Sequence, residues 1–107
     1  MSSVNDRIQG LIDQNRVLVF MKGSRNIPMC GFSATVVQTL DRLRVPYETV
    51  DVLKDPEIRE GVKGFSKWPT IPQVYVDGKF LGGCDIVRDM YQSGELEPLL
   101  RASAEEN

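Results

Sequence analysis

The chain has 107 residues, 41% of them hydrophobic and 26% charged, which is enough for one domain with an apolar core. Its formal net charge is −2, and lysine and arginine are scattered, so we expect no nucleic acid partner. No apolar run reaches the length of a membrane span and the first residues lack the pattern of a signal peptide, so we expect no membrane partner.

The first half of the chain alternates helix and strand. Apolar residues at helical spacing predict an amphipathic helix from about Val4 to Asn15. The apolar run Arg16–Met21 has strand length and suits a strand that is covered on both faces. A polar loop over Lys22–Met29 leads to a helix from Ser33 to about Leu43, and Val45–Val52 predicts a second strand.

The second half begins with another helix start. Asp55 is placed as an N-cap and Pro56 as the first helical residue. The dipeptide Asp77-Gly78 between two short apolar runs predicts a hairpin of strands Gln73–Val76 and Lys79–Leu81.

Two helices are expected to finish the chain, one from about Asp85 and a short one over Glu95–Arg101, before a polar tail, 102–107, that should fray. A βαβ unit followed by a ββα unit gives a four-stranded mixed sheet with helices on both faces. We therefore predict a single α/β domain of thioredoxin-like fold over residues 1–107.

The strongest functional signal is the sequence Cys30-Gly31-Phe32-Ser33, where a strand hands over to a helix. The free N–H groups and positive end of a helix stabilise a thiolate there. Ser33 stands where a two-cysteine redox motif would have its second sulfur, so no neighbour can resolve a mixed disulfide. The alternative is a buried apolar cysteine, but Gly31 leaves room for another molecule to approach, which favours a functional thiolate.

Cysteine and histidine counts narrow the chemistry further. Cys30 and Cys84 are too few for a disulfide scaffold, and a reducing compartment is the better expectation. The chain has no histidine, which removes imidazole bases and ordinary Cys/His zinc sites. Cys84 is either a packed small residue or a reserve thiol able to pair with Cys30.

Further candidates carry weaker signals. Lys22, at a strand end, either is solvated or faces the thiolate and lowers its pKa. Arg59 is by default a surface residue. The segment from Trp68 through Thr70 and Ile71 to Pro72 suggests a rigid turn with a candidate cis Ile71–Pro72 bond, which would expose the Ile71 backbone to an extended peptide ligand.

The last motif, Gly82-Gly83-Cys84-Asp85, opens a helix after the hairpin. Backbone N–H groups at such a site bind carboxylates, and glycines allow a ligand to come close. Asp85 is an N-cap, a partner for a ligand ammonium, or both.

Together these motifs resemble the CGFS-type monothiol glutaredoxins, from about Val4 to Leu100. The resemblance implies a thioredoxin-like fold with Pro72 at the cis-proline position, and glutathione as the ligand. The glutathione contacts that it implies are Lys22, Cys30, Phe32, Arg59, Thr70, Ile71, Pro72, Gly83, Cys84 and Asp85. Lys22 and Arg59 would contact the glycine carboxylate, the Ile71 backbone the cysteinyl part, and Cys84 with Asp85 the γ-glutamyl end.

Members of this family are associated with [2Fe–2S] clusters, and a ligand count bears on that expectation. A cluster normally needs four soft ligands, and two Cys30 thiolates with two glutathione thiols supply four. We expect a homodimer bridged by a labile cluster, acting in cluster transfer and iron homeostasis, with Cys30 the metal ligand and catalytic thiol.

The resemblance adds a BolA-type protein and iron–sulfur acceptor proteins as partners. The alternative function is a glutathione-dependent thiol–disulfide oxidoreductase that uses Cys30, and a pure protein-binding module would leave Lys22, Cys30 and Asp85 unexplained. The expected location is cytoplasmic, or a plastid stroma or mitochondrial matrix if a transit peptide has been removed.

Overall fold

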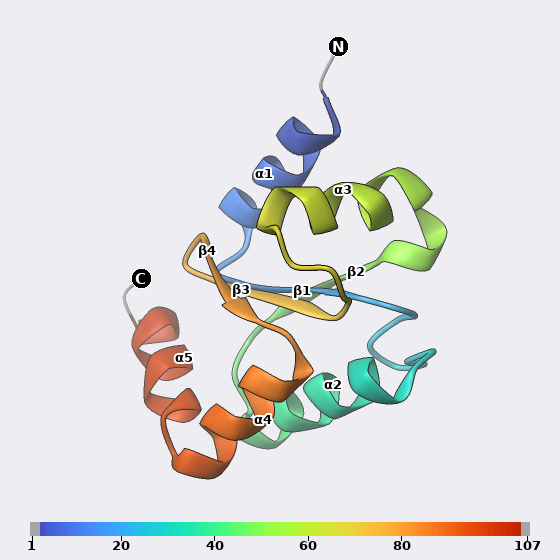
Figure 1. The fold of residues 1–107 in the computed structure, drawn as a ribbon. Helices are drawn as coiled ribbons and strands as arrows, with labels where there is room; N and C mark the ends of the chain where they lie inside the picture. Colours follow the sequence, from blue (N-terminus) through green and yellow to red (C-terminus); the bar gives the residue numbers. More distant parts are fainter. Residues whose placement is uncertain (1–2, 106–107) are drawn as a thin grey trace.

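The computed structural model describes residues 3–105, with side chains described as far as Arg101. Its helices are α1 (Val4–Gln14), α2 (Gly31–Leu43), α3 (Pro56–Ser66), α4 (Cys84–Ser93) and α5 (Leu96–Glu105), with a 3-10 helix, η1 (Val52–Lys54). Its strands are β1 (Val17–Met21), β2 (Glu48–Asp51), β3 (Gln73–Val76) and β4 (Lys79–Gly82). Figure 1 shows one sheet between two layers of helices.

The sheet is mixed, as the sequence predicts. Its strand order is β2-β1-β3-β4, with β1 and β2 parallel and the pairs β1/β3 and β3/β4 antiparallel. Helix α2 makes the crossover between the parallel strands, which such a pair requires. Asp77 and Gly78 both have positive φ, 52° and 80°, as a tight two-residue hairpin turn demands.

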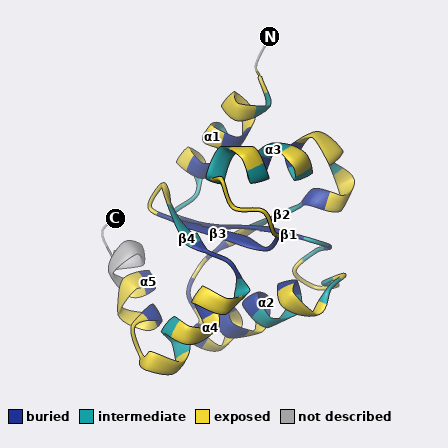
Figure 2. Ribbon diagram, in the orientation of Figure 1, coloured by how far each residue is buried: buried dark blue, intermediate teal, exposed yellow. Residues whose placement is uncertain are grey.

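Both faces of the sheet are covered by helices. Val17, Val19 and Met21 of β1 join the core formed with α2, α4 and α5. Leu18 and Phe20 point to the opposite face, into the core formed with α1 and α3. All five residues are buried (Figure 2), which explains why β1 is a continuous apolar run and not an alternating one.

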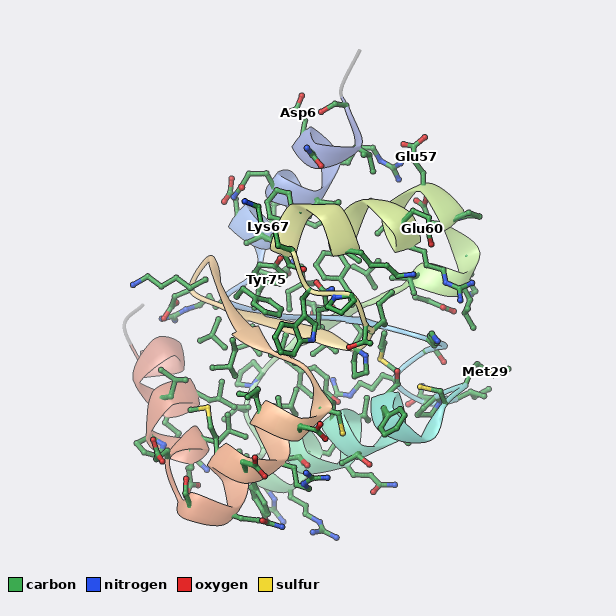
Figure 3. The ribbon with its side chains drawn as sticks, in the orientation of Figure 1. Asp6, Met29, Glu57, Glu60, Lys67 and Tyr75 are labelled. Carbon is green, nitrogen blue, oxygen red and sulfur yellow. The ribbon has the colours of Figure 1, made fainter. Side chains whose placement is uncertain are left out.

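A chain of aromatic rings connects the second core to the surface. Tyr75 lies between the sheet and α3 (Figure 3), with its ring centroid 5.9 Å from that of Phe20 and 5.4 Å from that of Phe80. Phe80 in turn lies 5.7 Å from the ring of Trp68. Such contacts stabilise by about 0.5–1.5 kcal/mol each beyond simple burial, so the segment that contains Trp68 is anchored to the core.

Two elements differ from the prediction by more than two residues at one end, and the other boundaries agree within two residues. The second strand covers only Glu48–Asp51 of the predicted Val45–Val52, because Pro46 has no N–H to donate to the sheet and the Asp51 side chain caps η1 at Leu53 N. The last helix continues to Glu105 instead of ending at Arg101. Most of the tail expected to fray is therefore helical, and residues 106–107 lie outside the described part.

Within residues 3–105, none of the helices combines the length and the apolar character that crossing a membrane would require.

Candidate functional site

Cys30 is the N-cap of α2. Its backbone is extended, with φ −152° and ψ 154°, and its Sγ accepts a hydrogen bond from the Ser33 backbone N–H at 3.3 Å. The Ser33 hydroxyl lies 3.3 Å from the same sulfur and itself accepts from the Lys22 N–H at 3.1 Å. Ser33 is fully buried. A chain of two hydrogen bonds thus joins the end of β1 to the sulfur.

These contacts favour the thiolate. Partial burial opposes ionisation of Cys30, but the hydrogen bonds from the side chain and backbone of Ser33 outweigh it, and the pKa of Cys30 is lowered from 9.0. The Phe32 backbone N–H and the positive charge of Lys22 act in the same direction. The sulfur is half-buried and not sealed in the core.

The loop between Lys22 and Cys30 depends on one glycine. Gly23 has φ +91°, and a Cβ there would lie 2.5 Å from the carbonyl oxygen of Ile27, so no other residue fits without moving the loop. The Met29 N–H donates to the Lys22 carbonyl at 2.8 Å. These contacts return the chain to α2 and bring Lys22 and Cys30 close to each other.

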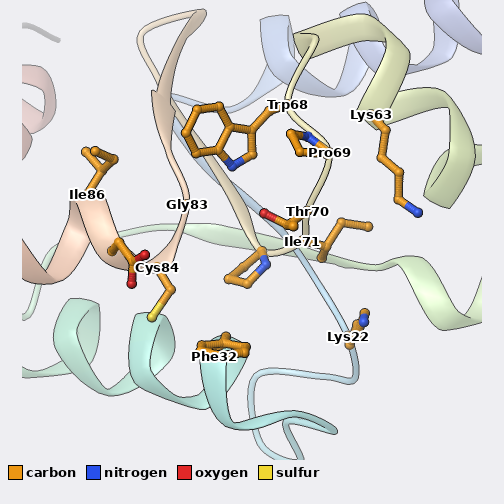
Figure 4. A pocket seen from close by; sticks show the side chains of 12 residues that line it. Lys22, Phe32, Lys63, Trp68, Pro69, Thr70, Ile71, Gly83, Cys84 and Ile86 are labelled. Atoms are coloured by element: carbon orange, nitrogen blue, oxygen red, sulfur yellow. The ribbon is translucent and has the colours of Figure 1, made fainter.

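A pocket of about 390 Å³ opens beside this thiol. Its lining comes from the end of β1, the start of α2, α3, the loop before β3 and the start of α4 (Figure 4): Lys22, Phe32, Lys63, Trp68, Pro69, Thr70, Ile71, Pro72, Gly83, Cys84, Asp85 and Ile86. The lining includes all the predicted glutathione contacts except Cys30 and Arg59. Cys30 precedes the lining residue Phe32 by two positions and is not itself part of the lining.

One end of the pocket is cationic. Lys22 and Lys63 lie on the same side in Figure 4, across from the start of α4. Arg59 does not line the pocket, and its Nε is buried without a partner among the described residues. Lys63 follows Arg59 by four residues, one turn along the same face of α3. That spacing is the signal by which sequence reasoning could have found Lys63.

The opposite end is the N-terminus of α4. Gly83 is its N-cap, and Asp85, which the sequence offered as an N-cap, lies within the first turn. No side chain accepts from the first N–H groups of α4, so they are free to bind a ligand in the pocket. Burial and the neighbouring Asp85 raise the pKa of Cys84. The pKa values of the two thiols therefore shift in opposite directions, and Cys30 is the more readily ionised of the two.

A rigid wall connects the two ends. The Ile71–Pro72 bond is cis, as the sequence suggested. Behind it the fully buried Gln73 donates its amide N–H groups to the carbonyls of Trp68 at 3.0 Å and Thr70 at 3.1 Å. The wall residues Trp68, Pro69 and Ile86 were not predicted as site residues, although Trp68 and Pro69 belong to the turn motif noted in the sequence.

Comparison with known proteins gives the family. Residues 17–81 match the family model described as Glutaredoxin. A relative from Synechocystis sp., named an uncharacterized monothiol glutaredoxin ycf64-like, is 56% identical over 97 residues, covering 91% of each chain.

Solved structures agree with this match. Reduced apo GrxS14 from poplar superposes with a TM-score of 0.79 at 44% identity, covering 92% of this chain and 90% of that one. A buckwheat glutaredoxin–glutathione complex superposes with a TM-score of 0.84 at 27% identity, covering 94% of this chain and 90% of that one. With one cysteine and a serine at the start of α2, this chain belongs to the glutaredoxin family, on its monothiol branch.

Proposed function

We propose that this chain binds glutathione in the pocket and, with a second copy of itself, carries a labile [2Fe–2S] cluster to acceptor proteins. The charges along the pocket support the first part. Glutathione has a glycine carboxylate at one end, which Lys22 and Lys63 would bind, and a zwitterionic γ-glutamyl group at the other. The N–H groups at the start of α4 would hold the γ-glutamyl carboxylate and Asp85 its ammonium. The central thiol would then lie near Cys30.

The other predicted contacts keep their roles in this proposal. Thr70, Ile71 and Pro72 would form the wall along the cysteinyl part, and Phe32 the edge beside Cys30. Arg59 stays among the proposed contacts because it shares a face of α3 with Lys63.

The observation that carries the cluster proposal is the scarcity of ligands in one chain. Among the described residues, no three His, Cys, Asp or Glu side chains come together to hold a metal ion. Of the two cysteines, Cys30 is the one whose pKa is lowered. Two Cys30 sulfurs from two copies and two glutathione sulfurs would supply the four thiolate ligands of a [2Fe–2S] cluster. A cluster held half by exchangeable small thiols is suited to delivery.

Partners and location follow from that role. The acceptors would be iron–sulfur proteins, and a BolA-type protein would replace one copy in the dimer and supply the histidine that this chain lacks. A reducing compartment, the cytosol or an organelle interior, would keep Cys30 and glutathione reduced. Such a carrier would contribute to iron homeostasis by transferring clusters to the iron–sulfur proteins that need them.

The test is anaerobic reconstitution with iron, sulfide and glutathione, followed by absorption spectroscopy and mass determination in solution. We expect a brown dimer that contains two glutathiones for each cluster. Cys30→Ser should abolish both colour and dimer, whereas Cys84→Ser should retain them. A colourless monomer from the wild type, or loss of the cluster in Cys84→Ser, would contradict the proposed ligand set.

The lowered pKa of Cys30 also favours a second function, reduction of glutathionylated proteins. The Cys30 thiolate would attack the glutathione sulfur of the mixed disulfide, forming Cys30–S–S–glutathione and releasing the protein thiolate. A second glutathione thiolate would then restore Cys30 and leave as glutathione disulfide. Rapid turnover of a glutathionylated peptide by a colourless monomer would favour this function over cluster transfer.

A further inference from the structure

Trp68 is held rigidly at the pocket wall. Its backbone N–H donates to the Ser66 hydroxyl at 3.1 Å, and its carbonyl accepts from Gln73 at 3.0 Å. Its ring packs against Phe80 with centroids 5.7 Å apart and remains 38% exposed toward the pocket. The ring is therefore pre-organised, and little side-chain conformational entropy is lost when a ligand contacts it.

The indole N–H of Trp68 faces into the pocket. In Figure 4 its nitrogen points between Gly83 and Thr70. A Cβ built on Gly83 would lie 3.3 Å from this nitrogen, so the donor lies close to the start of α4. No residue in the described part of the chain accepts a hydrogen bond from it. Because an indole N–H can only donate, it suits a ligand group that accepts.

The position of this donor selects one end of the ligand. Lys22 and Lys63 lie at the far end of the pocket, whereas Trp68 shares its end with Gly83 and the free N–H groups of α4. An α-carboxylate placed at that helix start has lone pairs left after it has accepted from the backbone. Two side-chain donors of the wall have no acceptor among the described residues, the Trp68 indole N–H and the Thr70 hydroxyl. Of these two, only the indole N–H can donate without also accepting.

We infer that Trp68 is a specificity residue for the γ-glutamyl group: its indole N–H donates to the γ-glutamyl α-carboxylate while its ring covers the adjoining methylenes. This inference rests on the proposed binding of glutathione in the pocket. It separates the two ends of the site by chemistry, with cations for the glycine carboxylate and a helix start with an aromatic donor for the γ-glutamyl carboxylate. Trp68 contributes affinity for ligands that have a γ-glutamyl group and none for ligands that lack it.

The test compares three ligands by titration calorimetry: glutathione, γ-glutamylcysteine, which lacks the glycine, and cysteinylglycine, which lacks the γ-glutamyl group. Trp68→Phe keeps a ring on Phe80 and removes only the donor. We expect it to weaken the binding of glutathione and of γ-glutamylcysteine by the same factor, about tenfold for one hydrogen bond to a carboxylate at the lower end of its range, and to leave the binding of cysteinylglycine unchanged. Lys63→Met is the matched contrast, because it should weaken glutathione and cysteinylglycine and spare γ-glutamylcysteine.

The outcomes separate this inference from the proposed function. Equal binding of glutathione by wild type and Trp68→Phe would overturn the inference and leave glutathione binding intact. An equal loss for all three ligands would also overturn it, because the wall and not the donor would then be responsible. No binding of glutathione by the wild type would overturn both. Trp68 is the only tryptophan in the chain, so wild-type fluorescence should respond to γ-glutamylcysteine more than to cysteinylglycine.

Discussion

Replacing Ser33 with alanine should weaken Cys30 as a nucleophile and loosen the junction between β1 and α2. The Ser33 hydroxyl is fully buried, lies 3.3 Å from the Cys30 sulfur and accepts from the Lys22 N–H at 3.1 Å. When Cys30 is a thiolate, this hydroxyl donates to it and lowers its pKa. A hydrogen bond to a charged group contributes about 1.5 kcal/mol at the lower end of its range. That amounts to about a tenfold smaller ratio of thiolate to thiol below the pKa. The orphaned Lys22 N–H should cost a further 1–2 kcal/mol or so of unfolding free energy.

The assay is the rate of alkylation of Cys30 by iodoacetamide as a function of pH, with Cys84→Ser in both proteins so that one thiol is followed. At neutral pH we expect Ser33→Ala to react about tenfold more slowly, with no loss of the plateau at high pH. Ser93→Ala, which removes a hydroxyl from the exposed end of α4, is the control and should match the wild type. An unchanged pH profile, or one reduced equally at every pH, would refute the reasoning, because the latter would reflect access to the sulfur and not its ionisation.

Three further outcomes are expected. Because folding lowers the pKa of Cys30 from 9.0, the thiolate stabilises the folded state above that value, and this stabilisation is lost as pH falls through the folded pKa. Denaturant titrations should therefore show that the unfolding free energy of wild type exceeds that of Cys30→Ser by an amount that rises with pH up to about 9. A difference that does not change with pH would contradict this. Since the pKa of Cys84 is raised, mass spectrometry after limited alkylation near neutral pH should find Cys30 labelled first, and preferential labelling of Cys84 would reverse the assignment. Arg25 pairs with Asp41 at 2.9 Å and lies over the ring of Tyr47, 4.1 Å from its centroid; Arg25→Ala should lower the unfolding free energy by about 0.5–1 kcal/mol, less at high salt, and an equal loss at all salt concentrations would exclude an ion pair as the cause.

Much of the fold could be predicted because each element has a local signal. The run Val17–Met21 has no polar residue, which only a strand covered on both faces tolerates, and the dipeptide Asp77-Gly78 has residues that accept positive φ. The end of α5 was missed, because nothing at Arg101 stops a helix and the following residues include alanine, the best helix former. The predicted β2 was too long. Pro46 has no N–H to donate to the neighbouring strand, and the Asp51 side chain caps η1, so both limits depend on groups around the strand.

The amino-acid order alone decided the kind of chemistry: a cysteine at the beginning of a helix, a serine in place of a second cysteine, and no histidine. The tertiary structure decided which groups share a pocket. It added Lys63 to the predicted lining residues, placed the ring of Trp68 from the predicted turn in the wall, and left Arg59 outside the lining. The physical reason is the separation in sequence of the residues that interact. Helix caps, turns and β-strand patterns depend on residues a few positions apart. A pocket wall depends on how helices such as α3 and α4 pack against opposite faces of one sheet, and that packing is set by contacts between residues far apart in the chain.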